Sequence, residues 1–451
     1  MDANYIGLFG VIILLILAMS SFHVGIAMGV VGVAGICILL GPVPASTLFT
    51  HMSFSTATVF DFAVIPLFTV MGIVLSHGGL VDDIYKLLDN VLVKVHGGIM
   101  IATMIAAGFF AACSGSSIAA AVTFSKISVP EMIKRKYSPW FATGGVAAVG
   151  TQSALIPPSA ILIIYAIIAE QPVGKMLMAG LLPGILSNLL YCVAVVSVAK
   201  LLPGWAPPVD KNDHFSWVKT KRHIPWVWPI PVLMFLVLGA IYTGFATPSE
   251  AAAVGAFGAI VISFLLVFFK SRFTGEKIST YETIQRIKIG TAFTGACSST
   301  AMIFFILIGA MFFGQFIMLS QLPNVFAEFI VNLEISKWLI LIVIMLVWTV
   351  LGTFMSSIAV IVIIVPVILP VMIALEFDPL WFGVIVAKLT EMAMITPPVG
   401  MNLYAVKGAV GNTATFGEIV KGTLPFLAAD VVTLAVLVAI PSISLLIPEA
   451  M

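Results

Sequence analysis

Two clusters of small hydroxylated residues interrupt segments that are otherwise apolar enough to cross a bilayer. The first is Ser114-Gly115-Ser116-Ser117, and the second joins Gly352-Thr353 to Ser356-Ser357. Hydroxyl and freed carbonyl oxygens are the hard ligands that a small cation prefers, while helix amino termini at such interruptions attract anions. A lone serine cluster more often bonds back to its own helix or aids helix packing. Duplicated clusters favour ion and substrate binding instead.

A pair of adjacent prolines follows each cluster. These pairs are Pro157-Pro158 and Pro397-Pro398. Two prolines remove two amide donors and disfavour helical geometry before them, so the carbonyl groups around Ile156 and Thr396 lose their helical partners and can face a ligand. A simple kink is the alternative. Small or polar residues beside the prolines favour a cation or substrate cradle: Ser159, Gly400 and Asn402.

The clusters and breaks belong to an internal duplication. Ser116-Ser117 recurs as Ser356-Ser357, 240 residues later, and the prolines at 130, 139, 157 and 158 recur at 370, 379, 397 and 398 without a gap. Proline is about one residue in twenty, so chance supplies roughly one such match over half of the chain. Interrupted membrane helices in corresponding positions of two halves point to the binding site of a secondary transporter.

The composition indicates an all-α polytopic membrane protein. Hydrophobic residues make up 61% of the chain and charged residues 9%, against about 45–50% and about 25% in soluble domains. Several segments reach the roughly 20 apolar residues that span the hydrocarbon. The net charge of +1 argues against nucleic acid as a partner. No P-loop motif is present, so we do not expect ATP bound to this chain to drive it.

The placement of charge predicts that the two halves have inverted topology. Most Lys and Arg lie in 134–136, 200–222 and 270–288, which the positive-inside rule places in the cytoplasm. The corresponding stretches 41–58 and 372–378 contain no Lys or Arg. Each half then has three spanning helices, a re-entrant hairpin, a broken helix and a final span.

These features define two repeats and a cytoplasmic linker at 201–224. In the first repeat, 1–200, we expect scaffold helices at 1–60, an interfacial arm at 79–96, a hairpin at 97–128 and a broken helix at 138–168. In the second repeat, 225–451, the same elements are expected at 225–270, 321–336, 337–370 and 380–410. Both arms are amphipathic, and a loop helix packed on the protein is as good an interpretation of either.

Three strings carry a family resemblance that runs over essentially the whole chain: LIPPSAILIIYAIIAEQPVGKMLMAGLLPGIL, YTGFATPSEAAAVGA and MAMITPPVGMNLYAVKGAV. In this order they resemble the large membrane subunit of the tripartite ATP-independent periplasmic (TRAP) transporters, within the ion-transporter superfamily. The resemblance implies a sodium-coupled, elevator-type importer in the bacterial inner membrane. It also implies a small four-helix membrane subunit, a periplasmic substrate-binding protein and a small organic acid as substrate, of the dicarboxylate, sialate or sugar-acid class. Lys126 departs from the small residue that we expect there.

Two sodium sites and a substrate site follow as predictions. Sodium site 1 comprises Ser114, Gly115, Ser116, Ser117, Gly150, Thr151, Ile156 and Pro157. Sodium site 2 comprises Gly352, Thr353, Ser356, Ser357, Thr396, Pro397 and Gly400. The substrate residues are Ser117, Ser159, Ser357, Asn402, Lys126 and Lys388. A self-sufficient sodium/carboxylate symporter or exchanger of related inverted-repeat fold is the alternative function. An enzyme is disfavoured, because the hairpin tips offer no acid-base pair.

Several charged residues lie within apolar segments. Thr247-Pro248-Ser249-Glu250 reads as a capping box that starts a helix. Lys388 and Glu391 lie three apart on one helical face, and they either neutralise each other or serve the site. Asp430 and Asp61 are expected at the membrane interface.

Overall fold

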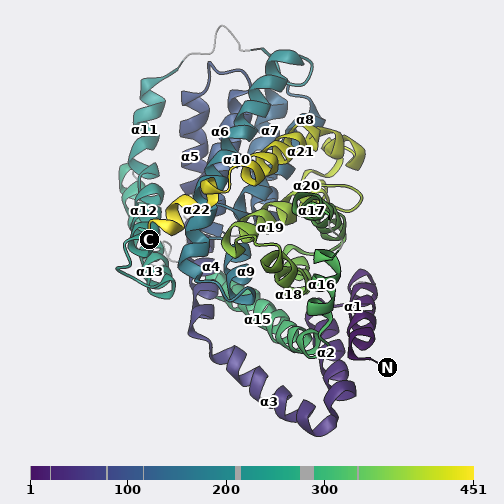
Figure 1. Ribbon diagram of the computed structural model, residues 1–451. Helices are drawn as coiled ribbons and strands as arrows, with labels where there is room; N and C mark the ends of the chain where they lie inside the picture. Colours follow the sequence, from purple (N-terminus) through teal and green to yellow (C-terminus); the bar gives the residue numbers. More distant parts are fainter. Residues whose placement is uncertain are drawn as a thin grey trace.

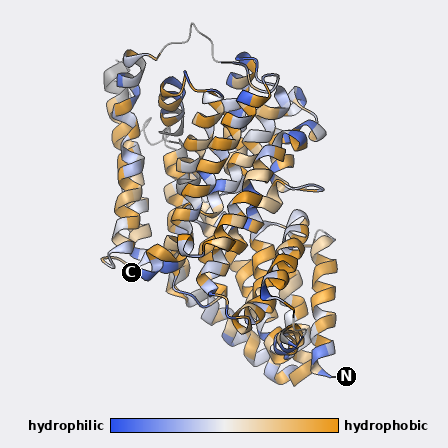
Figure 2. Cartoon of the chain, turned by 45° about the horizontal axis from the view of Figure 1, so that its top comes forward, coloured by the Kyte–Doolittle hydropathy of each residue, from blue (hydrophilic) through white to orange (hydrophobic). Residues whose placement is uncertain are grey.

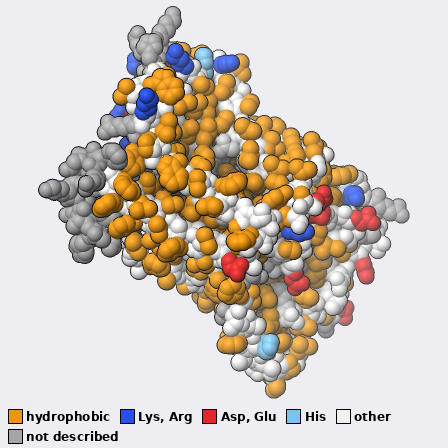
Figure 3. Space-filling model, turned by 90° about the vertical axis from the view of Figure 1, so that its left-hand side faces the viewer, with side chains coloured by type: hydrophobic (Ala, Val, Ile, Leu, Met, Phe, Trp, Pro, Cys, Tyr) orange, Lys and Arg blue, Asp and Glu red, His pale blue; other side chains and the backbone are white. Residues whose placement is uncertain are grey.

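The computed structural model describes residues 2–20, 22–77, 80–114, 116–208, 215–274, 289–332 and 335–451. All regular secondary structure in this part of the chain is helical (Figure 1). Seven of the described helices are long and apolar enough to span a membrane. Apolar residues run along the helices throughout (Figure 2), and Figure 3 shows a broad apolar surface with Lys and Arg gathered mainly at one end of the view. The chain is therefore a polytopic helical membrane protein, as the composition predicts.

The first half contains ten α-helices in its described part. They are α1 (Ala3–Met19), α2 (Val24–Leu40), α3 (Pro42–Thr58), α4 (Val64–His77), α5 (Leu80–Val91), α6 (Gly98–Ser114), α7 (Ser117–Lys134), α8 (Pro139–Val149), α9 (Ala160–Ile168) and α10 (Val173–Leu201). Two short 3-10 helices, η1 (Phe60–Ala63) and η2 (Gly150–Ala154), precede α4 and follow α8.

The described part of the second half is likewise helical. It contains α11 (Trp217–Val227), α12 (Pro229–Tyr242), α13 (Pro248–Thr274), α15 (Ile289–Leu319), α16 (Leu322–Val331), α17 (Lys337–Phe354), α18 (Ser357–Ala374), α19 (Pro379–Met394), α20 (Met401–Val410), η3 (Gly411–Thr413), α21 (Phe416–Ala439) and α22 (Ser442–Glu449).

The elements of the two halves correspond at the offset seen in the sequence. Helices α7 and α18 begin at Ser117 and Ser357, and α8 and α19 begin at Pro139 and Pro379. The second helix of each hairpin runs beyond the predicted ends at 128 and 370, because Pro130 and Pro370 lie inside helices and do not end them. A helix tolerates the loss of one hydrogen bond where tertiary packing and membrane hold it together.

One helical layer combines elements from both halves. Helix α15 packs along α2 and α4 and also touches α3, in the lower half of Figure 1. Glycines allow this close approach, since a Cβ at Gly25 would lie 3.0 Å from the Phe305 carbonyl oxygen. The scaffold predicted at 225–270 omits α15. Its 31 residues are apolar like any other span, and only the packing shows that it belongs with α2.

A second layer contains the hairpins, the broken helices and α10 and α21. Helix α21 lies so close to α8 that a Cβ on either Gly144 or Gly422 would overlap the backbone of the other helix. Small residues at a crossing let two backbones approach closely, which is the usual way for membrane helices to gain packing energy. This contact joins the first broken helix to the last span of the second half.

The two predicted arms pack differently. Helix α5 lies against α6 and α11, and its Asp89 accepts two hydrogen bonds from Arg135, at 2.8 and 2.6 Å. Helix α16 packs on α18 and α1. Both arms therefore contact a hairpin, and α5 reaches Arg135 directly after α7.

Candidate functional site

Each hairpin turns at a serine that caps the following helix. The Ser116 hydroxyl accepts a hydrogen bond from the Ala119 amide at 3.3 Å, and the Ser356 hydroxyl accepts one from the Ala359 amide at 3.4 Å. An N-cap serine satisfies one of the free amides at a helix start. Both tips thus present a capped helix amino terminus and hydroxyl groups. Gly115 and the Ser114 side chain lie outside the described residues.

The helix breaks fall at the proline pairs. Pro157-Pro158 and Pro397-Pro398 are both cis, and helical hydrogen bonding stops before each. After the first break the Ser159 hydroxyl donates to the Ala154 carbonyl at 2.6 Å and caps α9. After the second break Gly400 has φ of 57° at the start of α20, a conformation that suits glycine. At each proline pair one helical segment therefore ends and another begins a few residues later.

Each hairpin tip packs against the break of its own half. A Cβ at Gly150 would lie 2.5 Å from the Ser117 carbonyl oxygen, and a Cβ at Gly352 would lie 2.7 Å from the Cβ of Ala393. The Gly400 amide donates to the Thr353 carbonyl at 3.3 Å. Among the described residues, the structure therefore brings Ser117 next to Gly150 at the first predicted sodium site, and Thr353 next to Gly400 at the second. Whether they bind sodium stays a prediction.

The hydroxyls of the predicted sodium sites mostly bond within their own helices. Thr151 donates to Ala148, Thr353 to Val350 and Thr396 to Met392, at 2.7, 2.8 and 2.7 Å. This is the back-bonding expected of serine and threonine in membrane helices. A hydroxyl that donates its proton to a carbonyl keeps its lone pairs, so these oxygens can still accept a cation. Thr151 Oγ1 uses one lone pair to accept from the Tyr191 hydroxyl at 2.7 Å, which leaves the other.

Three polar side chains connect the two halves at the first tip. Asn402 Nδ2 donates to Ser117 Oγ at 2.8 Å, and Ser117 Oγ donates to Glu391 Oε2 at 2.9 Å. Glu391 and Asn402 are fully buried, and their Oε1 and Oδ1 atoms have no hydrogen-bond partner in the described part of the chain. In the sequence, Ser117 belongs to the first hairpin tip and Asn402 follows the second proline pair. Nothing in the linear pattern shows that α20 reaches α7.

Lys388 pairs with Asp430 rather than with Glu391. Its Nζ lies 2.5 Å from Asp430 Oδ1 and donates to Ser187 Oγ at 2.7 Å. Both charged side chains are at most 1% exposed. The expectation that Asp430 lies at the interface is wrong, because α21 points it into the layer of hairpins and broken helices. Lys388 is neutralised there, and its role in substrate binding stays a prediction.

Other predicted residues lie apart from this cluster. Lys126 is exposed on α7 and Ser159 is buried behind its break, and neither lines the cavity described below. The capping box at the start of α13 is confirmed, since the Thr247 amide donates to Glu250 Oε2 at 2.8 Å and the Glu250 amide to Thr247 Oγ1 at 3.3 Å. The side chain of Asp61 lies outside the described residues.

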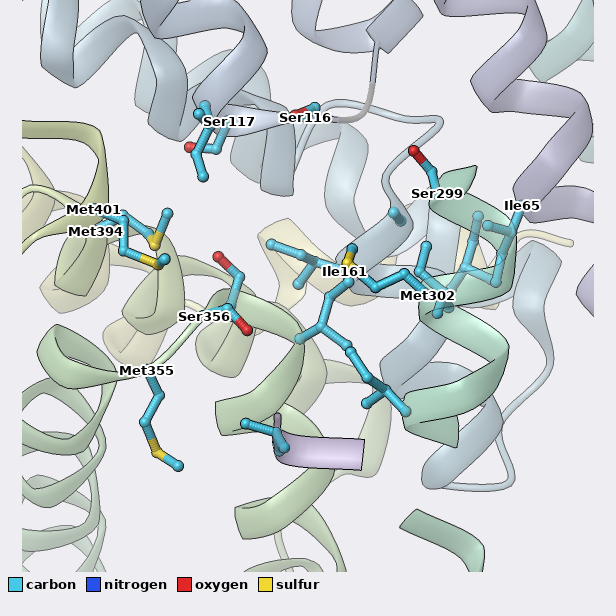
Figure 4. A pocket seen from close by; sticks show the side chains of 18 of the residues that line it. Ile65, Ser116, Ser117, Ile161, Ser299, Met302, Met355, Ser356, Met394 and Met401 are labelled. Atoms are coloured by element: carbon cyan, nitrogen blue, oxygen red, sulfur yellow. The ribbon is translucent and has the colours of Figure 1, made fainter. Parts of the chain in front are cut away.

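A cavity of about 560 Å³ lies between the two hairpin tips and the helical layer of α2, α4 and α15. Figure 4 shows Ser116 and Ser117 on one side, Ser356 nearby, and Ser299 and Met302 of α15 across from them. Ser357 and Glu391 also line it. Its size suits a small organic molecule, since ligand pockets are typically about 300–1,000 Å³. This cavity is the candidate substrate site, with two predicted substrate residues, Ser117 and Ser357, in its wall.

Comparison with known proteins gives consistent matches along the chain. A family model described as "Tripartite ATP-independent periplasmic transporter, DctM component" matches residues 11–443. The C4-dicarboxylate TRAP transporter large permease protein DctM of Pseudomonas aeruginosa is 30% identical over 396 residues, 88% of each protein. The isethionate TRAP transporter permease protein DctMQ of Oleidesulfovibrio alaskensis is 29% identical over 93% of this chain and 63% of its own length. The YdaH transporter of Alcanivorax borkumensis has a similar fold, with a TM-score of 0.57 at 14% identity over 100% of this chain and 98% of that structure.

Proposed function

Since the chain belongs to the DctM-component family of the tripartite ATP-independent periplasmic transporters, and so is a transporter subunit and not an enzyme, we propose that it carries a small organic acid across the bacterial inner membrane, driven by sodium. The observation that supports this most is that both duplicated tips face one cavity, with a proline break packed behind each. Two repeats of inverted topology explain why the same tip, cap and break occur twice.

Sodium binding gives the oxygen atoms at the two hairpin tips a function. Carbonyl and hydroxyl oxygens of 114–117 with 150–157 form one proposed ion site, and those of 352–357 with 396–400 form the other. An ion bound at each tip draws the hairpin onto its break and completes the cavity wall for an anion. Uptake into proteoliposomes should therefore need an inward sodium gradient. Undiminished uptake with potassium replacing sodium on both sides would refute the proposal.

The proposed movement is that of an elevator. The hairpins, broken helices, α10 and α21 form the unit that carries substrate, while α1, α2, α3, α4 and α15 form the scaffold. Ile118 lines the cavity beside the first tip and is 40% exposed, so Ile118→Cys in a background without the four native cysteines should change its labelling with sodium and substrate. Val43→Cys on α3 should not respond. Labelling at 118 that ignores both, in a variant that still transports, would contradict the movement.

The partners are part of the proposal. The family is tripartite, and one relative has the name DctMQ and is longer than this chain. We expect a small four-helix membrane subunit and a periplasmic binding protein to deliver the acid. Full-rate uptake by this chain alone would favour the self-sufficient symporter instead.

A further inference from the structure

The wall of the candidate substrate cavity is mainly apolar on both of its faces. Figure 4 shows Ile65 and Met302 on the scaffold side, with Ile161, Met394 and Met401 on the side of the broken helices. Met355 beside the second tip also lines the cavity. Methionine is unbranched and polarizable, so it adapts to apolar ligands of irregular shape. A substrate in this cavity is thus surrounded chiefly by side chains and sulfur atoms that give no strong hydrogen bonds.

The same wall contains little positive charge. Among the residues that the structure describes, no Lys or Arg lines the cavity. It contains one imidazole, His23, and one carboxylate, Glu391. Lys388 does not line the cavity and is paired with Asp430. The favourable places for negative charge are the amino termini of α7 and α18, capped by Ser116 and Ser356.

We infer that the cavity takes an amphipathic monoanion, an organic acid with one carboxylate and an apolar body, and discriminates against dianions. One carboxylate is held at the two hairpin tips, and the apolar body lies against the methionines and isoleucines. A second carboxylate, at the end of the apolar body away from the tips and from the sodium ions proposed there, would face mainly apolar side chains, with no Lys or Arg among the described ones. The inference rests on the proposed function, since it names the substrate class of the same cavity.

The apolar wall predicts how affinity changes with chain length. Burial of one methylene group contributes about 0.8 kcal/mol, which is about fourfold in affinity. Hexanoate should therefore bind about 15-fold more tightly than butanoate. Hexanedioate, which replaces the terminal methyl group with a second carboxylate, should bind at least about tenfold more weakly than hexanoate.

The test measures these three dissociation constants by calorimetry with the full chain, and any co-purified subunit, in lipid nanodiscs with sodium. Binding to the permease itself avoids the selectivity of the periplasmic protein. The inference is overturned if hexanedioate binds as tightly as hexanoate or more tightly, or if hexanoate binds no more tightly than butanoate. Either result would leave the proposed function intact. If none of the three anions binds, the proposed substrate site fails, and the inference fails with it.

A matched pair of variants ties the effect to this cavity. Met302 and Met311 both lie on α15 and are 48% and 44% exposed, but only Met302 lines the cavity. Met302→Gln should reduce the gain in affinity from butanoate to hexanoate by at least about threefold, since an amide group replaces part of the apolar cavity wall. Met311→Gln should keep the full gain. An equal effect of both variants, or of neither, would show that the methylene groups are buried elsewhere and would overturn the inference.

Discussion

Removal of the charge on Lys388 should destabilise the protein strongly, and simultaneous removal of the charge on Asp430 should restore most of the loss. The two side chains are fully enclosed, and the pair holds α19 to α21, with Ser187 of α10 as a third partner. Breaking a buried ion pair from one side leaves an uncompensated charge and costs about 3–5 kcal/mol. Lys388→Met and Asp430→Leu should each lower the free energy of unfolding by an amount in that range.

The double variant Lys388→Met/Asp430→Leu should lie within about 2 kcal/mol of the wild type, because apolar residues of similar volume can replace a buried pair at little cost. The coupling energy between the two sites is then at least about 4 kcal/mol, well above the additivity expected for independent sites. The Tyr191 ring, 5.2 Å from Lys388 Nζ, can pack against the methionine in its place.

The assay is reversible unfolding in mixtures of detergent and dodecyl sulfate, followed by tryptophan fluorescence. Lys126→Met is the control, since Lys126 is exposed on α7, and it should change stability by less than about 0.5 kcal/mol. The pair does not hold these helices together if the losses of unfolding free energy add up in the double variant. The same conclusion follows if neither single variant loses more unfolding free energy than the control.

Two further predictions concern close contacts at glycine. Gly422→Val should reduce the free energy of unfolding by more than about 2 kcal/mol, because the valine side chain would overlap the α8 backbone near Trp140. Gly417→Val on the same helix is the control, since the side chain there enters open space. Equal melting temperatures for the two variants would refute the close packing of α8 on α21. Gly150→Ala should raise the sodium concentration needed for half-maximal uptake by about tenfold, which is about 1.4 kcal/mol, because a Cβ there meets the Ser117 carbonyl. Gly408→Ala, with no atom near its Cβ, should behave as wild type. An unchanged sodium dependence in Gly150→Ala would remove Gly150 from the ion site.

Local breaks in the chain were predictable from the sequence. Proline pairs and the repeat offset depend on residues close in sequence, and helices end and begin at the positions that they indicate. The capping of α7 by Ser116 and of α18 by Ser356 was not among the predictions. The capping box at Thr247 and Glu250 is equally local, and its interpretation is confirmed.

The partners of buried charged groups were not predictable. Lys388 has a carboxylate three residues away on its own helix, yet its partner is Asp430, and Glu391 instead accepts from Ser117. Helical spacing brings Lys388 and Glu391 onto one face, but helix packing places α21 and α10 around the lysine and α7 beside the glutamate. Apolar sequence of uniform character contains little information about which helices become neighbours. The packing of α15 on α2 and α4 escaped prediction for the same reason.

The number of sodium ions carried with each substrate molecule tests the central claim most directly. With the three components reconstituted in vesicles, the membrane voltage at which net substrate flux stops is measured as the sodium gradient is varied. Two tips, each packed on its own break, predict at least two sodium ions per substrate molecule. A flux that stops at the same voltage whatever the sodium gradient would contradict the account.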